Sequence, residues 1–189
     1  MADASFIAGV AAGFIGFVLE DRVSHLIAGR RFRQRIASDI ELITRNYADF
    51  LPTLKRQTAA LEEILNRGEM PDDPSLYHPI WSNEFTLLPH LVENSAHLAA
   101  PVFDTCVEFY DVLGRTNEIR LAHNRSALHL GVSDEDRLQH LRFVLYCRRE
   151  QIQEYVLLIR KGGTALRSLR RRYIVRVDRE LIDSVLAPA

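Results

Sequence analysis

The chain has 189 residues, of which 47% are hydrophobic and 26% are charged, and its formal net charge is −1. This composition is typical of a folded protein and excludes a disordered or collagen-like chain. The near-neutral charge argues against a dedicated nucleic-acid-binding protein. Long periodic segments and few glycines after Gly16 predict an all-α fold, with an N-terminal transmembrane helix followed by an antiparallel bundle of three to four long helices.

The first segment, residues 4–19, carries no charge and is flanked by Asp3 and Glu20. As a helix it would be about 24 Å long, which is short of the hydrocarbon core of about 30 Å, so spanning requires local thinning of the bilayer. A buried helix of a soluble protein is one alternative. A cleaved signal peptide is another, but the segment lacks a positively charged start and a small-residue cleavage site.

Small or polar residues gather on one face of this predicted helix, opposite a face of large apolar residues. Such a face allows close approach of a second helix in lipid, from another copy or from a different protein. The predicted helix-packing face consists of Ser5, Gly9, Gly13, Gly16 and Glu20.

Basic residues follow the uncharged segment and none precedes it. The positive-inside rule therefore predicts that the N-terminus lies outside and that the rest of the chain lies in the cytoplasm, at the inner (cytoplasmic) membrane. The same side chains are candidates to attract anionic lipid. This juxtamembrane group consists of Arg30, Arg31, Arg33 and Arg35.

Residues 31–67 have apolar side chains at alternating spacings of three and four, with Gln57 filling a gap, which predicts a long helix. Pro52 predicts a kink or two consecutive helices, and Gly68 predicts the end of the segment. Residues 69–83 contain three prolines and are predicted to be a loop. We expect its aromatic residues, Tyr77 and Trp81, to pack against the end of the bundle.

A second long helix is predicted to start after Ser82 or just beyond Pro89 and to run to about Arg120, with a kink at Pro101. Residues 122–132 are predicted to be a connection. Ser133 with Asp136 resembles a capping box at the start of the next helix, and Gly162-Gly163 predicts a break or hinge in that helix. The predicted organisation is a membrane anchor (1–28), a cytoplasmic bundle (29–163) and a basic C-terminal helix (164–189).

The C-terminal segment is strongly basic. Its candidate partners are an anionic leaflet, an acidic protein and nucleic acid, and a basic face paired with acids elsewhere in the bundle is the alternative. Nucleic acid is disfavoured because Tyr173 is the only aromatic residue interleaved with the charges. The predicted basic patch consists of Arg167, Arg170, Arg171, Arg172, Arg176 and Arg179.

The order of these features resembles that of bacterial and archaeal proteins with one N-terminal span and a cytoplasmic helical domain of unknown function. The resemblance covers about residues 5–120 and implies no activity. It is carried by Asn46-Tyr47, Trp81, Phe109-Tyr110 and Asn117, whereas the prolines within helices and the basic C-terminal segment depart from the pattern.

The sequence shows no signature of an enzyme and predicts no catalytic residue, cofactor or metal site. His90, Glu93 and His97 share a helical face that a divalent metal could use, with a solvated polar face as the alternative. An Arg followed by four to six residues and a His would resemble the motif of helical ribonucleases of the HEPN type. The gaps in Arg125-x-x-x-His129 and Arg137-x-x-His140 are shorter than that.

Cys106 and Cys147 fit no metal-binding spacing, so we expect two reduced core residues, with an interhelical disulfide as the alternative. The sequence therefore favours a membrane-anchored scaffold or accessory subunit that acts through protein contacts. A sensor with two bundle states, kinked at Pro52 and Pro101, and a histidine-dependent effector are the alternatives.

Overall fold

The computed structural model describes residues 4–73, 76–77, 87–128 and 134–187, and the side chains of these residues except those of 4–21, Leu128 and Asp134. Within these ranges the chain forms helices and no strand, which confirms the predicted all-α class. The elements are α1 (Ala4–Asn66), α2 (Leu88–Glu93), the 3-10 helix η2 (Ser95–His97), α3 (Ala100–Leu128), α4 (Asp134–Arg172) and α5 (Arg179–Leu186).

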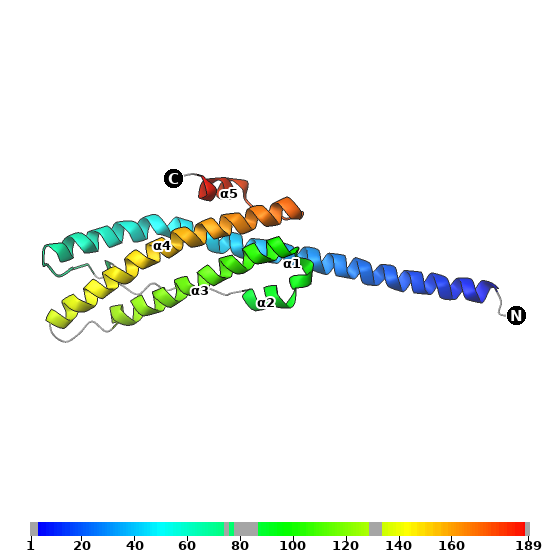
Figure 1. The fold of residues 1–189 in the computed structure, drawn as a ribbon, viewed down its shortest axis with the longest axis horizontal. Coiled ribbons are helices and arrows are strands. Elements are labelled where there is room, and N and C mark those ends of the chain that lie inside the picture. Colours follow the sequence, from blue (N-terminus) through cyan, green and yellow to red (C-terminus); the bar gives the residue numbers. More distant parts are fainter. Residues whose placement is uncertain (1–3, 74–75, 78–86, 129–133, 188–189) are drawn as a thin grey trace.

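Three long helices form the bundle, and α4 is its central member. It packs against both α1 and α3, whereas the short α5 packs against α4. Figure 1 shows that α4 runs antiparallel to both neighbours, so α1 and α3 point in the same direction. The antiparallel bundle predicted from the sequence is therefore present, with a parallel pair of helices that the sequence did not predict.

α1 continues well beyond the bundle. Its 63 residues give a helix about 95 Å long, and its N-terminal part extends away from the other helices (Figure 1). Residues 22–28 are all exposed. Among residues 22–66 of the helix, the first buried one is Gly29. We call residues 4–28 of α1 the arm.

The structure does not support the predicted transmembrane helix. No helix in the described part of the chain contains a stretch long and apolar enough to cross a bilayer. The physical reason lies in the sequence, since the uncharged segment has only sixteen residues and many of them are alanine, glycine or serine.

The C-terminal end of α1 agrees with the sequence. Gly68 has a φ of +72°, and the amide of Glu69 donates to the carbonyl of Ile64 at 3.2 Å while that of Gly68 donates to Leu65 at 3.1 Å. This is the Schellman arrangement, which satisfies carbonyls that the last turn leaves unpaired. α1 is one helix through Pro52, so of the two predicted alternatives the consecutive helices are not observed.

Pro101 starts a helix, and the predicted kink there is wrong. It is the second residue of α3, where its missing amide hydrogen costs no helical bond because the first turn has no acceptor for it. The short α2 and η2 precede this start, and α3 then runs on to Leu128, beyond the predicted end at Arg120.

The predicted break at Gly162-Gly163 is also wrong, because α4 runs through both glycines to Arg172. A Cβ atom on Gly162 would lie 2.0 Å from Oγ1 of Thr44 in α1, and one on Gly163 would lie 2.5 Å from Cγ2 of Val185 in α5. The glycines therefore allow close packing of α4 on two neighbours, which is a different role from a hinge.

The apolar core consists of two clusters of buried residues. The larger joins α1 up to Leu54, α3 up to Leu113 and α4 from Tyr155 onward with α2 and α5. The smaller lies toward the opposite end of the bundle and includes Leu61 and Leu141. Tyr77 packs against the smaller cluster, as predicted for the aromatic loop, whereas Trp81 lies outside the described residues.

Candidate functional site

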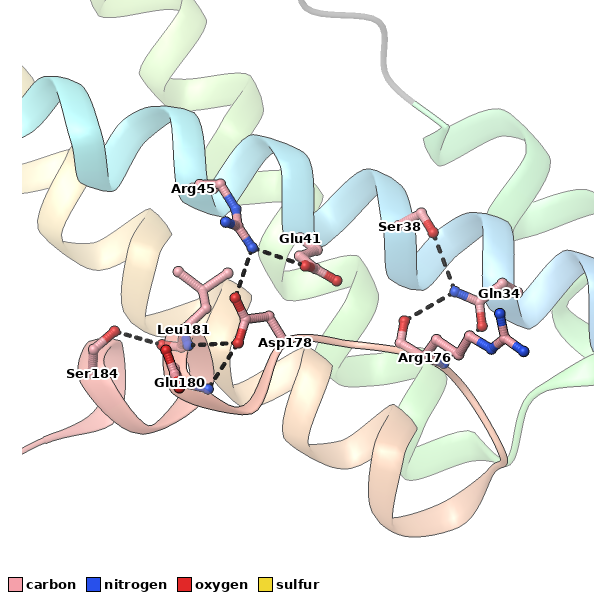
Figure 2. A network of polar contacts seen from close by, with 9 residues as sticks. All are labelled: Gln34, Ser38, Glu41, Arg45, Arg176, Asp178, Glu180, Leu181 and Ser184. Atoms are coloured by element: carbon pink, nitrogen blue, oxygen red, sulfur yellow. Dashed lines mark hydrogen bonds and ion pairs between the residues drawn. The ribbon is translucent and has the colours of Figure 1, made fainter.

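The C-terminal segment after α4 lies along α1 and is held there by Gln34. The backbone amide of Arg176 donates to Oε1 of Gln34 at 2.8 Å, and Nε2 of Gln34 donates to the carbonyl of Arg176 at 3.0 Å (Figure 2). The two bonds engage both backbone groups of one residue, so they fix the position of Arg176 beside the arginines of α1.

Three of the four predicted juxtamembrane arginines share a surface with Arg176. Arg31 and Arg35 are one helical turn apart, as are Arg30 and Gln34, so these side chains follow one face of α1. They line a groove of about 630 Å³ that we call the arginine groove. Its lining residues are Ile27, Arg30, Arg31, Gln34, Arg35, Ile174 and Arg176.

Arg33 lies apart from the other three. Its Nη1 donates to the carbonyl of His97 at 3.1 Å, and its guanidinium carbon lies 4.7 Å from the centre of the Tyr173 ring. The hydroxyl of Tyr173 in turn accepts a hydrogen bond from the amide of Ala99 at 2.6 Å. Arg33 therefore joins α1 to η2 and to the C-terminal segment, and its role is structural.

The lining of the arginine groove contains four arginines and no acidic residue. A second hollow of about 240 Å³ shares Arg31 and Arg35 with it and is likewise lined without an acid. Among the residues that the structure describes, none of these four arginines forms an ion pair. Within the described residues these four arginines therefore have no ion-pair partner, and the carboxylate of Asp39 attracts one of them, Arg35, through its charge.

Two nearby carboxylates are engaged elsewhere. Asp178 accepts from the amide of Leu181 and from that of Glu180 at the start of α5, and lies 2.9 Å from Nη2 of Arg45 (Figure 2). These bonds lower the pKa of Asp178, with the Leu181 amide contributing most. Asp39 accepts from the Tyr110 hydroxyl at 2.6 Å. Its partial burial raises its pKa, and the Tyr110 bond and the charge of Arg35 oppose this change.

The rest of the predicted C-terminal patch does not line the groove. Only Arg176 does, whereas the other five arginines lie on the last turns of α4 or at the first residue of α5. The structure thus divides the predicted patch, and it joins one of its members to a predicted group that lies about 140 residues earlier in the chain. The five are Arg167, Arg170, Arg171, Arg172 and Arg179.

A second group of polar residues is buried inside the bundle, and the sequence analysis did not predict it. These side chains lie between the two apolar clusters, on all three long helices. We call them the polar layer, which consists of Thr58 from α1, Thr116, His123 and Asn124 from α3, and Arg148 and Gln151 from α4.

His123 is the centre of the polar layer. Nε of Arg148 donates to Nε2 of His123 at 3.2 Å, so the ring hydrogen is on Nδ1, which donates to Oδ1 of Asn124 at 3.0 Å. Burial, reinforced by the charge of Arg148 and opposed by the bond to Asn124, lowers the pKa of His123 to about 4. The ring is therefore neutral at pH 7.

Arg148 is one of the largest fully buried side chains, with 1% of its surface exposed. Burial lowers its pKa to about 10, so it remains charged at neutral pH. Its Nη1 and both amide atoms of Gln151 have no hydrogen-bond partner in the described structure. A buried charge without an acidic partner lowers the free energy of unfolding. We therefore expect the polar layer to destabilise the bundle relative to an apolar layer of the same volume.

One sequence signal could have found this layer. The apolar spacing of α4 runs Leu141, Leu145, Ile152 and Tyr155, and position 148 is the missing member of that series. In α1 the corresponding inward residue is Thr58, at 4% exposure, and Gln57 is only half-buried, so the residue predicted to fill this gap was the wrong one.

The remaining candidates do not converge on a site. His90 Nδ1 lies 3.4 Å from Glu93, but α2 ends at Glu93, and His97 follows in η2 with its ring 6.0 Å from that of Phe32. The described residues contain no group of three potential metal ligands. Cys106 and Cys147 are buried and free, and burial raises the pKa of Cys106 to about 12.

Other predicted residues lie outside the description. This holds for His129 and Ser133, and for the side chains of the helix-packing face, of which only the helical backbone within α1 is described. Comparison of the chain with protein-family models, with curated proteins and with solved structures finds no match.

Proposed function

We propose that the protein is a membrane-associated scaffold or accessory subunit, held at the bilayer by its arm and acting through protein contacts made by the arm and the bundle. The supporting observation is that α1 continues past the bundle for about seven turns. Its first sixteen residues carry no charge, and next to the bundle it exposes Val23, Leu26 and Ile27. Where its side chains are described, at residues 22–28, the arm is exposed, and a bilayer is the partner whose chemistry fits such an apolar helix.

The proposed orientation follows from the charges. Arg30, Arg31 and Arg35 come directly after the arm, and no Lys or Arg comes before residue 22. With these charges on the cytoplasmic side, the bundle lies in the cytoplasm at the inner membrane. The face with Gly9 and Gly13 is then available to a helix of a second copy or of another membrane protein.

Fractionation of cells that express the full chain tests the membrane association. We expect the wild-type protein in the membrane pellet after an alkaline wash, and Phe14→Glu, which places a charge in the uncharged segment, in the supernatant. Leu42→Glu is the matched control, because Leu42 is an exposed apolar residue of the same helix outside the arm, with 59% of its surface exposed. Recovery of the intact wild-type chain in the soluble fraction would overturn the proposal.

Cross-linking in those membranes tests the helix partner. Gly9→Leu with Gly13→Leu blocks the close approach and should remove the cross-linked species. Ala4→Leu with Ala11→Leu places the same leucine side chains on the opposite face and should leave it unchanged. Identical cross-links in both double variants would exclude the glycine face as the contact surface.

A further inference from the structure

The arginine groove lies where the arm joins the bundle. Ile27 is the next-to-last residue of the arm, and the other lining residues of α1 follow within two turns. The C-terminal segment lies on the other side, with Arg176 held by Gln34. If the arm is in a bilayer, the groove is therefore at the height of the lipid headgroups.

The groove combines positive charge with exposed apolar side chains. Ile174 has 87% of its surface exposed and Ile27 has 46%, which are high values for isoleucine in a folded protein. They border Arg30, Arg31, Arg35 and Arg176 in the same lining. An occupant that satisfies both features has an anionic head and an adjoining apolar part.

The arginines suit a phosphate in particular. The planar guanidinium donates two parallel hydrogen bonds to phosphate oxygens, and this geometry gives specificity beyond charge alone. No acidic residue lines the groove. The nearby Asp178 is bonded to Arg45, and Asp39 is bonded to Tyr110 and attracts Arg35 only through its charge. A volume of about 630 Å³ accommodates a headgroup.

We infer that the arginine groove binds the phosphate group of an anionic phospholipid, with Ile27 and Ile174 against the adjoining acyl region. This inference rests on the proposed function, because a membrane-held arm brings the groove to the bilayer surface. It adds a defined site and a ligand class to that function. Because Arg176 comes from the C-terminal segment, the site also requires the Gln34 contact that holds this segment on α1.

Vesicle binding by the purified full chain tests the inference. The probes are vesicles of phosphatidylcholine alone and vesicles in which one lipid in four is phosphatidylglycerol. The groove variant is Arg31→Gln with Arg176→Gln, and the matched control is Arg125→Gln with Arg142→Gln. The control removes the same charge from exposed positions on α3 and α4, away from the groove.

We expect the wild type and the control to bind the anionic vesicles more tightly than the neutral ones. The groove variant should lose about 25-fold of its affinity for anionic vesicles, since each of the two arginines near such a surface contributes about fivefold. Its binding to neutral vesicles should not change. Its melting temperature should also not change, because the two side chains form no ion pair with any described residue.

Each other outcome is decisive. Equal losses of affinity in both double variants would overturn the inference that the groove is the binding site, and the total charge of the protein would then explain the binding. Equal wild-type binding to the two vesicles would overturn the inference while the proposed membrane association stands, and no binding to either would overturn both. Groove-dependent binding of polyglutamate, without an effect on vesicles, would replace the lipid with an acidic peptide.

Discussion

The polar layer and the arginine groove place the same residue type in two opposite environments. Arg148 is 1% exposed and its guanidinium is surrounded by the bundle, whereas Arg30, Arg31, Arg35 and Arg176 are all exposed at the surface. Burial lowers the pKa of Arg148, and it also lowers the pKa of His123 beside it. The difference teaches that position in the bundle, and not charge, decides whether an arginine acts on folding or is available to a ligand.

Removal of Arg148 should have the largest effect. We expect Arg148→Ala to lower the free energy of unfolding by about 3 kcal/mol, because it leaves a cavity and takes the donor from Nε2 of buried His123. Denaturant unfolding measures this. Arg148→Met also removes the charge and the donor but keeps most of the side-chain volume, so its loss should be smaller. Equal losses in both variants would mean that the cavity contributes nothing and that the lost donor to His123 accounts for the effect.

The protonation of His123 should have a comparable effect. Its pKa in the folded protein is about 4, against an ordinary value of 6.5. The unfolded state therefore binds more protons between these values, and stability falls as the pH drops from about 6.5 to about 4, by about 3 kcal/mol in total. Unfolding across this range in the wild type and in His123→Gln isolates the contribution. Parallel pH profiles of the two proteins would contradict the buried neutral ring.

The packing of α4 on α1 should show a smaller effect. Gly162→Ala places a Cβ against Oγ1 of Thr44, and we expect a loss of about 2 kcal/mol, because two buried helices must separate slightly. Gly114→Ala is the matched control in α3, where a Cβ meets nothing within 4 Å, and it should stabilise the helix by up to about 1 kcal/mol. Thermal unfolding compares them. A neutral Gly162→Ala would show that the helices tolerate the added methyl.

The groove should show the smallest effect on folding. Arg31→Gln with Arg176→Gln is expected to change the free energy of unfolding by less than about 0.5 kcal/mol, as is usual for exposed side chains without a partner. The same chemical denaturation experiment that is used for Arg148→Ala provides the measurement. A loss as large as that of Arg148→Ala would remove the contrast between the two environments.

The helices were largely predictable, because the pattern that specifies a helix lies within its own stretch of sequence. The spacing of apolar residues predicted the helical seams of α1, α3 and α4, and Gly68 marked the end of α1. The structural roles of proline and glycine were predicted less well. Pro101 begins a helix and Gly162-Gly163 lies inside one, since the same residue type serves either as a break or as a start or close contact, depending on its neighbours.

The sequence by itself determined the all-α class, the uncharged segment at residues 4–19 and the presence of two arginine-rich groups. These are properties of local pattern and composition. Only the tertiary structure decided that α1 and α3 run parallel, that Arg176 joins Arg31 and Arg35, and that His123 meets Arg148. Each of these depends on how distant segments are brought together, and helical periodicity specifies which face is buried but not which helix covers it.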